Sequence, residues 1–183
     1  MWKAIVFIAG TLALVYISRA SLRAPRSHGF YRFFAWECIL ALFLLNVDFW
    51  FRDPFAWHQI IAWVLLICSL IPLAFGVHSL RSRGKPVESR AGDPSLLAFE
   101  KTTELVTTGI YRYIRHPMYS SLLLLGWGIC FKMPSLPALA LALLTTIFLL
   151  ATAKADEAEC IQFFGTQYQD YMQRTKRFIP FLF

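Results

Sequence analysis

The sequence predicts an all-α, polytopic membrane protein with about five transmembrane helices and a cytoplasmic C-terminal helical segment. Of its 183 residues, 57% are hydrophobic and only 16% are charged, which is too apolar for an ordinary soluble domain. The apolar residues gather in runs, and a helix needs roughly 20 of them to cross a hydrocarbon core of about 30 Å. We therefore expect a single membrane domain over residues 1–183.

Five apolar runs are the expected spans. They are Trp2–Ser18, Phe30–Phe51, Trp57–Leu80, Met118–Phe131 and Leu136–Ala153. The first run has neither an extended charged leader nor a small-residue cleavage site before its basic flank, which favours a retained helix over a cleaved signal peptide. The last two runs are short and are separated by Met133, Pro134 and Pro137, which favours a tight helical hairpin.

The positive charge is distributed unevenly about these spans, and the net charge is +7. Most lysines and arginines fall on one side: Arg19, Arg23, Arg26, Arg32, Arg81, Arg83, Lys85, Arg90, Lys101, Arg112, Arg115, Lys154, Arg174, Lys176 and Arg177. The other side receives only Lys3, Arg52 and Lys132. By the positive-inside rule, the N-terminus is expected outside and the C-terminus in the cytoplasm. The excess of lysine and arginine over acidic residues thus indicates membrane topology and contact with anionic membrane lipids. We expect no nucleic acid as a partner.

Three regions follow from this reading. Residues 1–80 form three N-terminal spans, and residues 81–110 form a cytoplasmic loop that begins with a polar stretch rich in glycine, proline and charge. Residues 111–183 form the hairpin and the C-terminal helices. In the tail, Ile161, Phe164, Tyr168 and Tyr171 recur at helical spacing, with Gly165 as a possible interruption, which predicts a helix on the membrane face.

The cysteines give no sign of a disulfide or a metal site. Cys38, Cys68, Cys130 and Cys160 are isolated, with no C-x-x-C pair and no Cys/His cluster at zinc-ligand spacing. We expect small buried thiols and no metal.

One polar cluster precedes the fourth span. Pro117 suits the first position of a helix, which makes His116 the cap and leaves free N–H groups that, beside Arg115, favour an anion such as a carboxylate. Tyr111, Tyr113 and Tyr119 offer ring faces that attract a cation or stack on a base. The alternative is ordinary anchoring at the membrane interface, which is typical of arginine and tyrosine.

Carboxylates supply the second candidate cluster. Asp156 and Glu157, with Glu159 close by, follow the last span directly and could bind hydroxyls or an ammonium group. The alternative is that they are solvated acids favoured by a helix dipole. Glu37, inside the second span, is a further candidate because an ionisable group in lipid is costly, although a neutral hydrogen-bonded state is an equal reading.

These two clusters carry a resemblance. "LVTTGIYRYIRHPMYSS" at residues 105–121 and "DEAECIQFFGTQYQDYMQRTKRFIP" at residues 156–180 resemble the integral-membrane methyltransferases. That group includes the isoprenylcysteine carboxyl methyltransferases and the phospholipid N-methyltransferases. The resemblance covers roughly Thr103 to Pro180, whereas the first three spans match only in being apolar.

The resemblance implies a methyltransferase that uses S-adenosylmethionine and acts on a lipophilic or amphiphilic acceptor from the bilayer. The positions that match cofactor contacts are Leu105, Val106, Tyr111, His116, Pro117, Met118, Tyr119, Asp156 and Glu157. We expect Arg115, Glu157 and Glu159 as catalytic candidates, a carboxylate serving as base if the acceptor is protonated. Thr152 stands where the prenylcysteine enzymes carry a substrate-binding arginine, so the acceptor class stays open. The alternatives are a non-enzymatic membrane protein and a membrane reductase that uses NADPH, as sterol reductases do.

Overall fold

A computed structural model of the chain describes residues 1–85, 87 and 100–180. Its six α-helices are α1 (Trp2–Leu22), α2 (His28–Asn46), α3 (Trp57–Arg83), α4 (Pro117–Cys130), α5 (Leu136–Phe164) and α6 (Thr166–Arg174). Two short 3₁₀ helices, η1 (Val47–Phe49) and η2 (Gly109–Arg112), complete the described elements. No strand occurs within the described ranges, so the all-α prediction is confirmed.

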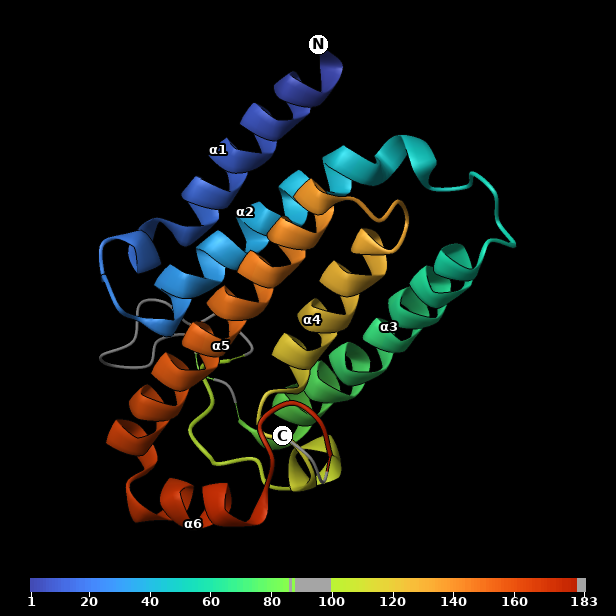
Figure 1. Cartoon of the computed structure of the whole chain (residues 1–183). Coiled ribbons are helices and arrows are strands. Elements are labelled where there is room, and N and C mark those ends of the chain that lie inside the picture. Colours follow the sequence, from blue (N-terminus) through green and yellow to red (C-terminus); the bar gives the residue numbers. More distant parts are fainter. Residues whose placement is uncertain (86, 88–99, 181–183) are drawn as a thin grey trace.

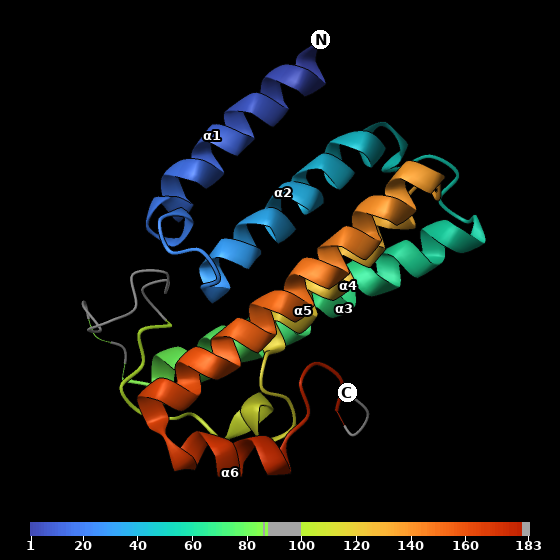
Figure 2. The same ribbon diagram turned by 60° about the vertical axis from the view of Figure 1, so that its left-hand side comes forward.

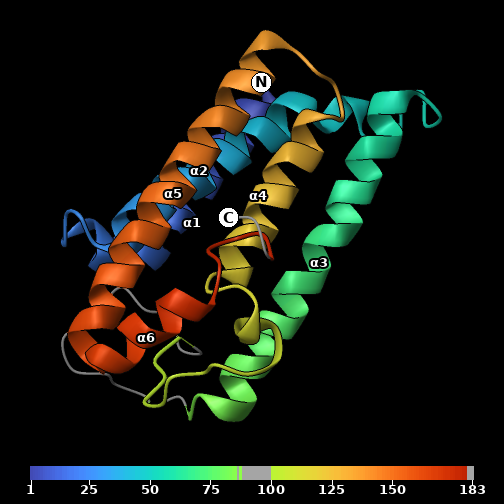
Figure 3. The same cartoon turned by 60° about the horizontal axis from the view of Figure 1, so that its bottom comes forward.

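The long helices form a bundle in which the neighbours are α1, α2, α5, α4 and α3, in that order (Figures 1 and 3). The most extensive pairings are α2 with α5 and α3 with α4. In Figure 2, α1 stands at the outer edge beside α2. Many of its apolar side chains, such as those of Ile5, Leu12 and Ile17, are exposed. This exposure of apolar surface is what a lipid-facing helix requires.

Within the described residues, four helices are long and apolar enough to cross a membrane: α1, the α2–η1 segment, α3 and α5. The fourth predicted span, α4, has only 14 residues and is therefore about 21 Å long. It lies between α5 and α3 at the middle of the bundle. The prediction of about five membrane helices is confirmed, with four full-length spans and one short one.

Local sequence signals set the helix ends. The Ser27 and Ser135 side chains accept hydrogen bonds from the backbone N–H groups of Phe30 and Ala138, which caps α2 and α5. α4 begins at Pro117 with His116 at the cap position, as predicted. α5 runs past the expected end of the span, to Phe164, so the acidic residues lie on the helix itself.

The C-terminal segment folds back onto the residues before α4. Arg115 and His116 donate backbone hydrogen bonds to the carbonyls of Lys176 and Arg177, at 2.8 and 3.1 Å. The Ser120 hydroxyl adds a bond of 2.8 Å to the carbonyl of Phe178. Since Phe178 is also buried against Tyr119 and α5, the tail closes one end of the bundle.

The opposite end of the bundle is closed by a different cluster. Lys132, in the turn between α4 and α5, has no exposed surface, and its ammonium group lies 3.5 Å from the ring centroid of Trp63. It donates hydrogen bonds to Gln59 Oε1 at 3.0 Å and to the carbonyl of Trp50 at 3.2 Å. The sequence assigned Lys132 to the outer side of the membrane but did not predict that its side chain is buried. Its side chain binds the end of α2 to α3 and α4.

Candidate functional site

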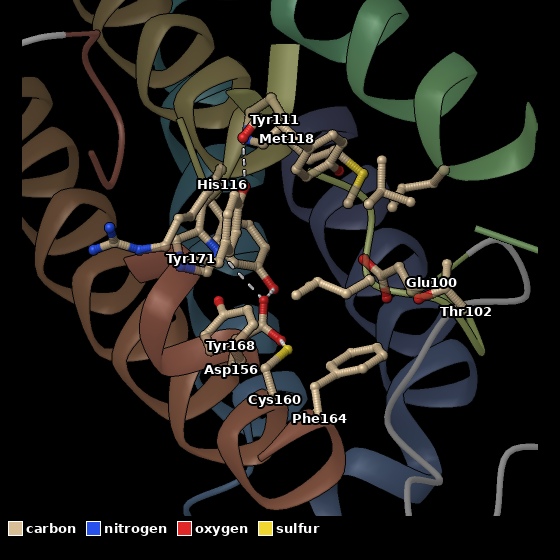
Figure 4. Close-up of a pocket in the computed structure, with 16 residues that line it drawn as sticks. Glu100, Thr102, Tyr111, His116, Met118, Asp156, Cys160, Phe164, Tyr168 and Tyr171 are labelled. Atoms are coloured by element: carbon tan, nitrogen blue, oxygen red, sulfur yellow. Dashed lines mark hydrogen bonds and ion pairs between the residues drawn. The ribbon is translucent and has the colours of Figure 1, made fainter. Parts of the chain in front are cut away.

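A cavity lies at the end of the bundle that carries α6 (Figure 4). The empty space between its walls is about 680 Å³, a figure that includes the open mouth. Every predicted site residue except Glu157 and Glu159 lines it. The lining consists of Leu80, Glu100, Thr102, Leu105, Val106, Tyr111, Arg115, His116, Pro117, Met118, Tyr119, Asp156, Cys160, Phe164, Tyr168 and Tyr171.

Several elements far apart in the sequence build this cavity. The segment before α4 contributes the side chains of residues 105–119, α5 contributes Asp156 and Cys160, and α6 contributes Tyr168 and Tyr171. The Tyr171 hydroxyl donates a hydrogen bond of 2.6 Å to the carbonyl of Tyr111, which fixes α6 against η2. The two sequence clusters, which the resemblance assigned to one cofactor site, both contribute side chains to this cavity.

His116 lies between the two members of the acidic pair. Its Nδ1 is 3.4 Å from Asp156 Oδ2, and its Nε2 is 3.3 Å from Glu157 Oε1. Burial acts to lower the pKa of His116, but the hydrogen bonds to Asp156 and Glu157 and the charges of these carboxylates outweigh burial and raise the pKa. Because both ring nitrogens face carboxylates, the geometry suits a doubly protonated imidazolium.

The carboxylate of Glu157 is paired with cationic side chains of the protein. Its Oε1 accepts from Arg115 Nε at 2.9 Å, and its Oε2 accepts from Arg177 Nη2 at 2.7 Å. Arg115 continues to the carbonyls of Met172 and Thr175 beyond it. Glu157 therefore ties α5 to the segment before α4 and to the tail, and it lies outside the cavity lining.

Glu159 is also engaged away from the cavity. It forms an ion pair with the ring of His28, at the start of α2, and accepts from the backbone N–H of His28 at 2.8 Å. His28, Asp156 and Glu159 each place one potential ligand atom within 4.8 Å of the others, an arrangement that could hold a metal ion. In the structure His28 and Glu159 form an ion pair with each other. The expected absence of a metal stays a prediction.

Tyrosine rings form the aromatic part of the lining. His116 stacks on Tyr119 with 5.2 Å between the ring centroids, and the Tyr119 hydroxyl donates to Asp156 Oδ2 at 3.1 Å. Tyr168 and Tyr171, on α6, pack edge to face at 5.7 Å. Burial raises the pKa of both α6 tyrosines well above the usual value, so they stay neutral. Of the residues on the predicted apolar face of the tail, Phe164, Tyr168 and Tyr171 line the cavity and Ile161 does not.

Sequence reasoning missed two polar residues of the lining, Glu100 and Thr102. Glu100 accepts hydrogen bonds from Arg32 Nη1 on α2, at 2.8 and 3.0 Å to its two oxygens. The Arg32 side chain is only 5% exposed, and it was counted above as a loop charge. The sequence does show a carboxylate, Glu100, just before the motif and an arginine, Arg32, inside the second apolar run. Nothing in the sequence indicates that these two residues form a pair.

Two other candidates take structural positions. The hydroxyl of Thr152, which is fully buried, donates to the carbonyl of Phe148 within α5 at 2.7 Å. Glu37 accepts a hydrogen bond of 2.9 Å from Thr11 and so joins α1 to α2, away from the cavity. Arg90 and the residues from 88 to 99 of the predicted loop lie outside the described residues.

Known proteins resemble parts of this chain. The sequence profile of the family described as phospholipid methyltransferase matches residues 92–167. A methanethiol S-methyltransferase of Crocosphaera subtropica is 30% identical over 79 residues, which are 42% of this chain and 29% of that protein. The protein-S-isoprenylcysteine O-methyltransferase B of Arabidopsis thaliana is 34% identical over 84 residues, 45% of this chain and 43% of that protein.

A Delta(14)-sterol reductase of Mus musculus is 26% identical over 128 residues, which are 65% of this chain and 31% of that protein. The aligned part thus spans less than half the length of each of these three curated relatives. The sterol reductase match is weaker than the methyltransferase matches. The matched profile runs over residues 92–167 and so includes every lining residue except Leu80, Tyr168 and Tyr171. The chain is thus similar to integral-membrane methyltransferases over part of its length.

Proposed function

We propose that the chain is a membrane-embedded methyltransferase that takes its methyl group from S-adenosylmethionine and transfers it to a lipophilic or amphiphilic acceptor. One observation carries the proposal. The motif before α4 and Asp156 of α5, which the sequence separates, line one cavity at the end of the bundle. The region of family similarity runs through both.

The lining suits the chemistry of this methyl donor. The donor carries a sulfonium, an ammonium, a carboxylate, a ribose diol and an adenine ring. Asp156 offers a carboxylate to a cationic group or a hydroxyl, and the Tyr119 ring offers a face to a cation or a base. Leu105, Val106, Pro117 and Met118 supply the apolar walls that ligand pockets require.

The residues of the chain hold, orient and shield the reactants. When bound, S-adenosylmethionine supplies a methyl group on a positively charged sulfur. The acceptor lone pair forms the new bond to the methyl carbon while the carbon–sulfur bond breaks and its electron pair stays on sulfur. Fixing two reactants in line is worth roughly 7–11 kcal/mol, so orientation is the main task of the protein. An acceptor that arrives deprotonated needs no base.

We assign positioning roles to Arg115 and Glu157. Glu157 joins Arg115, His116 and Arg177, so it holds the tail over the site and orients His116 toward Asp156. Glu159 performs the same kind of task through His28 on α2. These ion pairs speak against proton transfer by either glutamate, because each would have to leave its partners first.

We also propose that the cavity opens to the cytoplasm, with the N-terminus outside. The turn between α1 and α2, the end of α3 and α6 share the end of the bundle that carries the cavity (Figure 1). These segments, with the cavity-lining stretch before α4 and the tail that pairs with it, carry or flank ten basic residues: Arg19, Arg23, Arg26, Arg81, Arg83, Arg112, Arg115, Arg174, Lys176 and Arg177. The positive-inside rule therefore favours this orientation, in which a soluble methyl donor reaches the cavity from water and the acceptor reaches it from the bilayer.

A labelled-methyl transfer assay tests the proposal. The purified chain in nanodiscs is incubated with methyl-labelled S-adenosylmethionine and extracted membrane lipids, and mass spectrometry identifies the products. We expect label in a lipid-soluble product and an equal amount of S-adenosylhomocysteine. In Asp156→Asn, the loss of a charged hydrogen-bond partner should reduce transfer about tenfold to hundredfold. Asp170→Asn, at an exposed position of α6, is the matched control and should keep full transfer.

Two outcomes contradict the proposal. Binding of NADPH without binding of S-adenosylmethionine would support a reductase. Binding of neither cofactor, by a folded chain, would support a non-enzymatic membrane protein.

A further inference from the structure

The predicted acidic pair is largely neutralised by the protein itself. Asp156 and Glu157 face the cations of His116, Arg115 and Arg177, at distances of 2.7–3.4 Å. This group of two carboxylates and three cationic side chains carries a net positive charge when His116 is protonated. S-adenosylmethionine also carries a net positive charge, so these protein cations partly offset the attraction of Asp156 for the cationic end of the donor.

A further carboxylate lines the same cavity from the other side. In Figure 4, Glu100 lies across the cavity from Asp156, on the chain segment that leads to Thr102. The side chain of Glu100 is only 8% exposed. A carboxylate in such a low-dielectric position interacts strongly with a ligand cation, because water screens it little.

Arg32 fixes this carboxylate from α2. Its Nη1 reaches both oxygens of Glu100, and its guanidinium carbon lies 5.0 Å from the centroid of the Trp36 ring. Glu100 belongs to the cavity lining, whereas Arg32 does not. The pair is therefore arranged with its negative member toward the cavity and its positive member away from it.

We propose that Glu100 binds a cationic group of the methyl donor, the ammonium or the sulfonium, and that Arg32 is the residue that positions Glu100 for this contact. The inference rests on the proposed function. It adds a binding residue outside the motif. It also gives α2, in the N-terminal part of the chain, a role in the site, because Arg32 of α2 positions Glu100.

Ligand titration of the full chain in nanodiscs tests the proposal. S-adenosylmethionine and S-adenosylhomocysteine are titrated against wild type, Glu100→Gln and the matched control Glu104→Gln. Glu104 is a suitable control because it lies four residues away in an exposed pair with Lys85, and its side chain is 54% exposed. We expect Glu100→Gln to weaken S-adenosylmethionine binding about tenfold to hundredfold and Glu104→Gln to leave it unchanged.

The second ligand identifies the group that is bound. S-adenosylhomocysteine keeps the ammonium but lacks the positive charge on sulfur. An equal loss of affinity for both ligands would place Glu100 at the ammonium, and a loss confined to S-adenosylmethionine would place it at the sulfonium. Wild-type affinity for S-adenosylmethionine in folded Glu100→Gln would overturn the proposal.

A double-mutant cycle tests the role of Arg32. If Arg32 acts through Glu100, Arg32→Gln weakens methyl-donor binding in the wild-type background and has no further effect on Glu100→Gln. Additive losses would overturn the positioning role. Glu100→Asp, which keeps the charge, should recover part of the affinity, and thermal unfolding of each variant separates loss of binding from loss of fold.

A different experimental result would contradict the proposed function. A folded wild-type chain that binds neither adenosyl ligand contradicts the methyltransferase proposal, whatever the variants do. A wild-type chain that binds both, with Glu100→Gln unchanged, contradicts only the assignment of Glu100.

Discussion

His116 shows how single residues set the electrostatics of the site. It is buried, yet each ring nitrogen faces a carboxylate, and it stacks on Tyr119. Water around an isolated imidazolium would normally supply this stabilisation. Here Asp156 and Glu157 replace it, which is why the pKa of His116 is raised in spite of burial.

The raised pKa of His116 predicts a pH dependence of stability. A group whose pKa is higher in the folded state stabilises that state fully below its unfolded pKa of about 6.5. This contribution is lost as the pH rises through the higher folded pKa. We therefore expect the free energy of unfolding to fall as the pH rises above about 6.5, and His116→Gln to lose that part of the dependence. Chemical unfolding in detergent at a series of pH values measures it. An unchanged pH profile in folded His116→Gln would show that the imidazolium is not the cause.

At the scale of the elements, the turn between α5 and α6 decides where the α6 tyrosines point. Gly165 lies between α5 and α6 with φ +63° and ψ −137°. Residues other than glycine rarely adopt this backbone conformation. The turn redirects the chain by a large angle, and α6 runs across the end of the bundle (Figure 2). Tyr168 and Tyr171 are thereby brought to the cavity.

Gly165→Ala should destabilise this turn through the backbone alone, because a Cβ at this position meets nothing within 4 Å. Holding alanine in this conformation costs of order 1–3 kcal/mol. We expect a lower free energy of unfolding and weaker methyl-donor binding, since α6 shifts to relieve the strain. Gln167→Ala, an exposed position in α6, is the control and should change neither. Equal behaviour of the two variants in denaturant titration and ligand titration would contradict this account.

Over the whole molecule, the two ends of the bundle are held by different chemistry. The end with the cavity is held by ion pairs between α2, α5, the segment before α4 and the tail. The opposite end is held by the buried Lys132 between two tryptophan rings. Between them lies an apolar core of small and branched side chains from α2 to α5.

This separation predicts that the opposite end can be weakened without changing the site. Lys132→Met keeps a long apolar stem but leaves Gln59 Oε1 and the Trp50 carbonyl without their ammonium donor. Leaving buried acceptors unsatisfied costs about 1–3 kcal/mol. We expect a lower thermal unfolding temperature with unchanged affinity for S-adenosylmethionine. A matching loss of affinity would show that the two ends are coupled.

The sequence by itself determined the helices and part of the site. Apolar runs located the spans because the bilayer requires a minimum length of apolar helix. Pro117 marked the start of α4, and Gly165 marked the break after α5, because proline and glycine have special backbone preferences. The motif residues that line the cavity were also found from the sequence.

Only the tertiary structure decided which charges meet. Arg32 and Glu100 are 68 residues apart, and His28 and Glu159 are 131 apart. The pattern along a chain reports whether a residue is buried, but not which partner neutralises it. For this reason the sequence offered Glu157 and Glu159 as catalytic candidates, whereas the packing of α2 against α5 and of the tail against the segment before α4 gives them protein cations as partners.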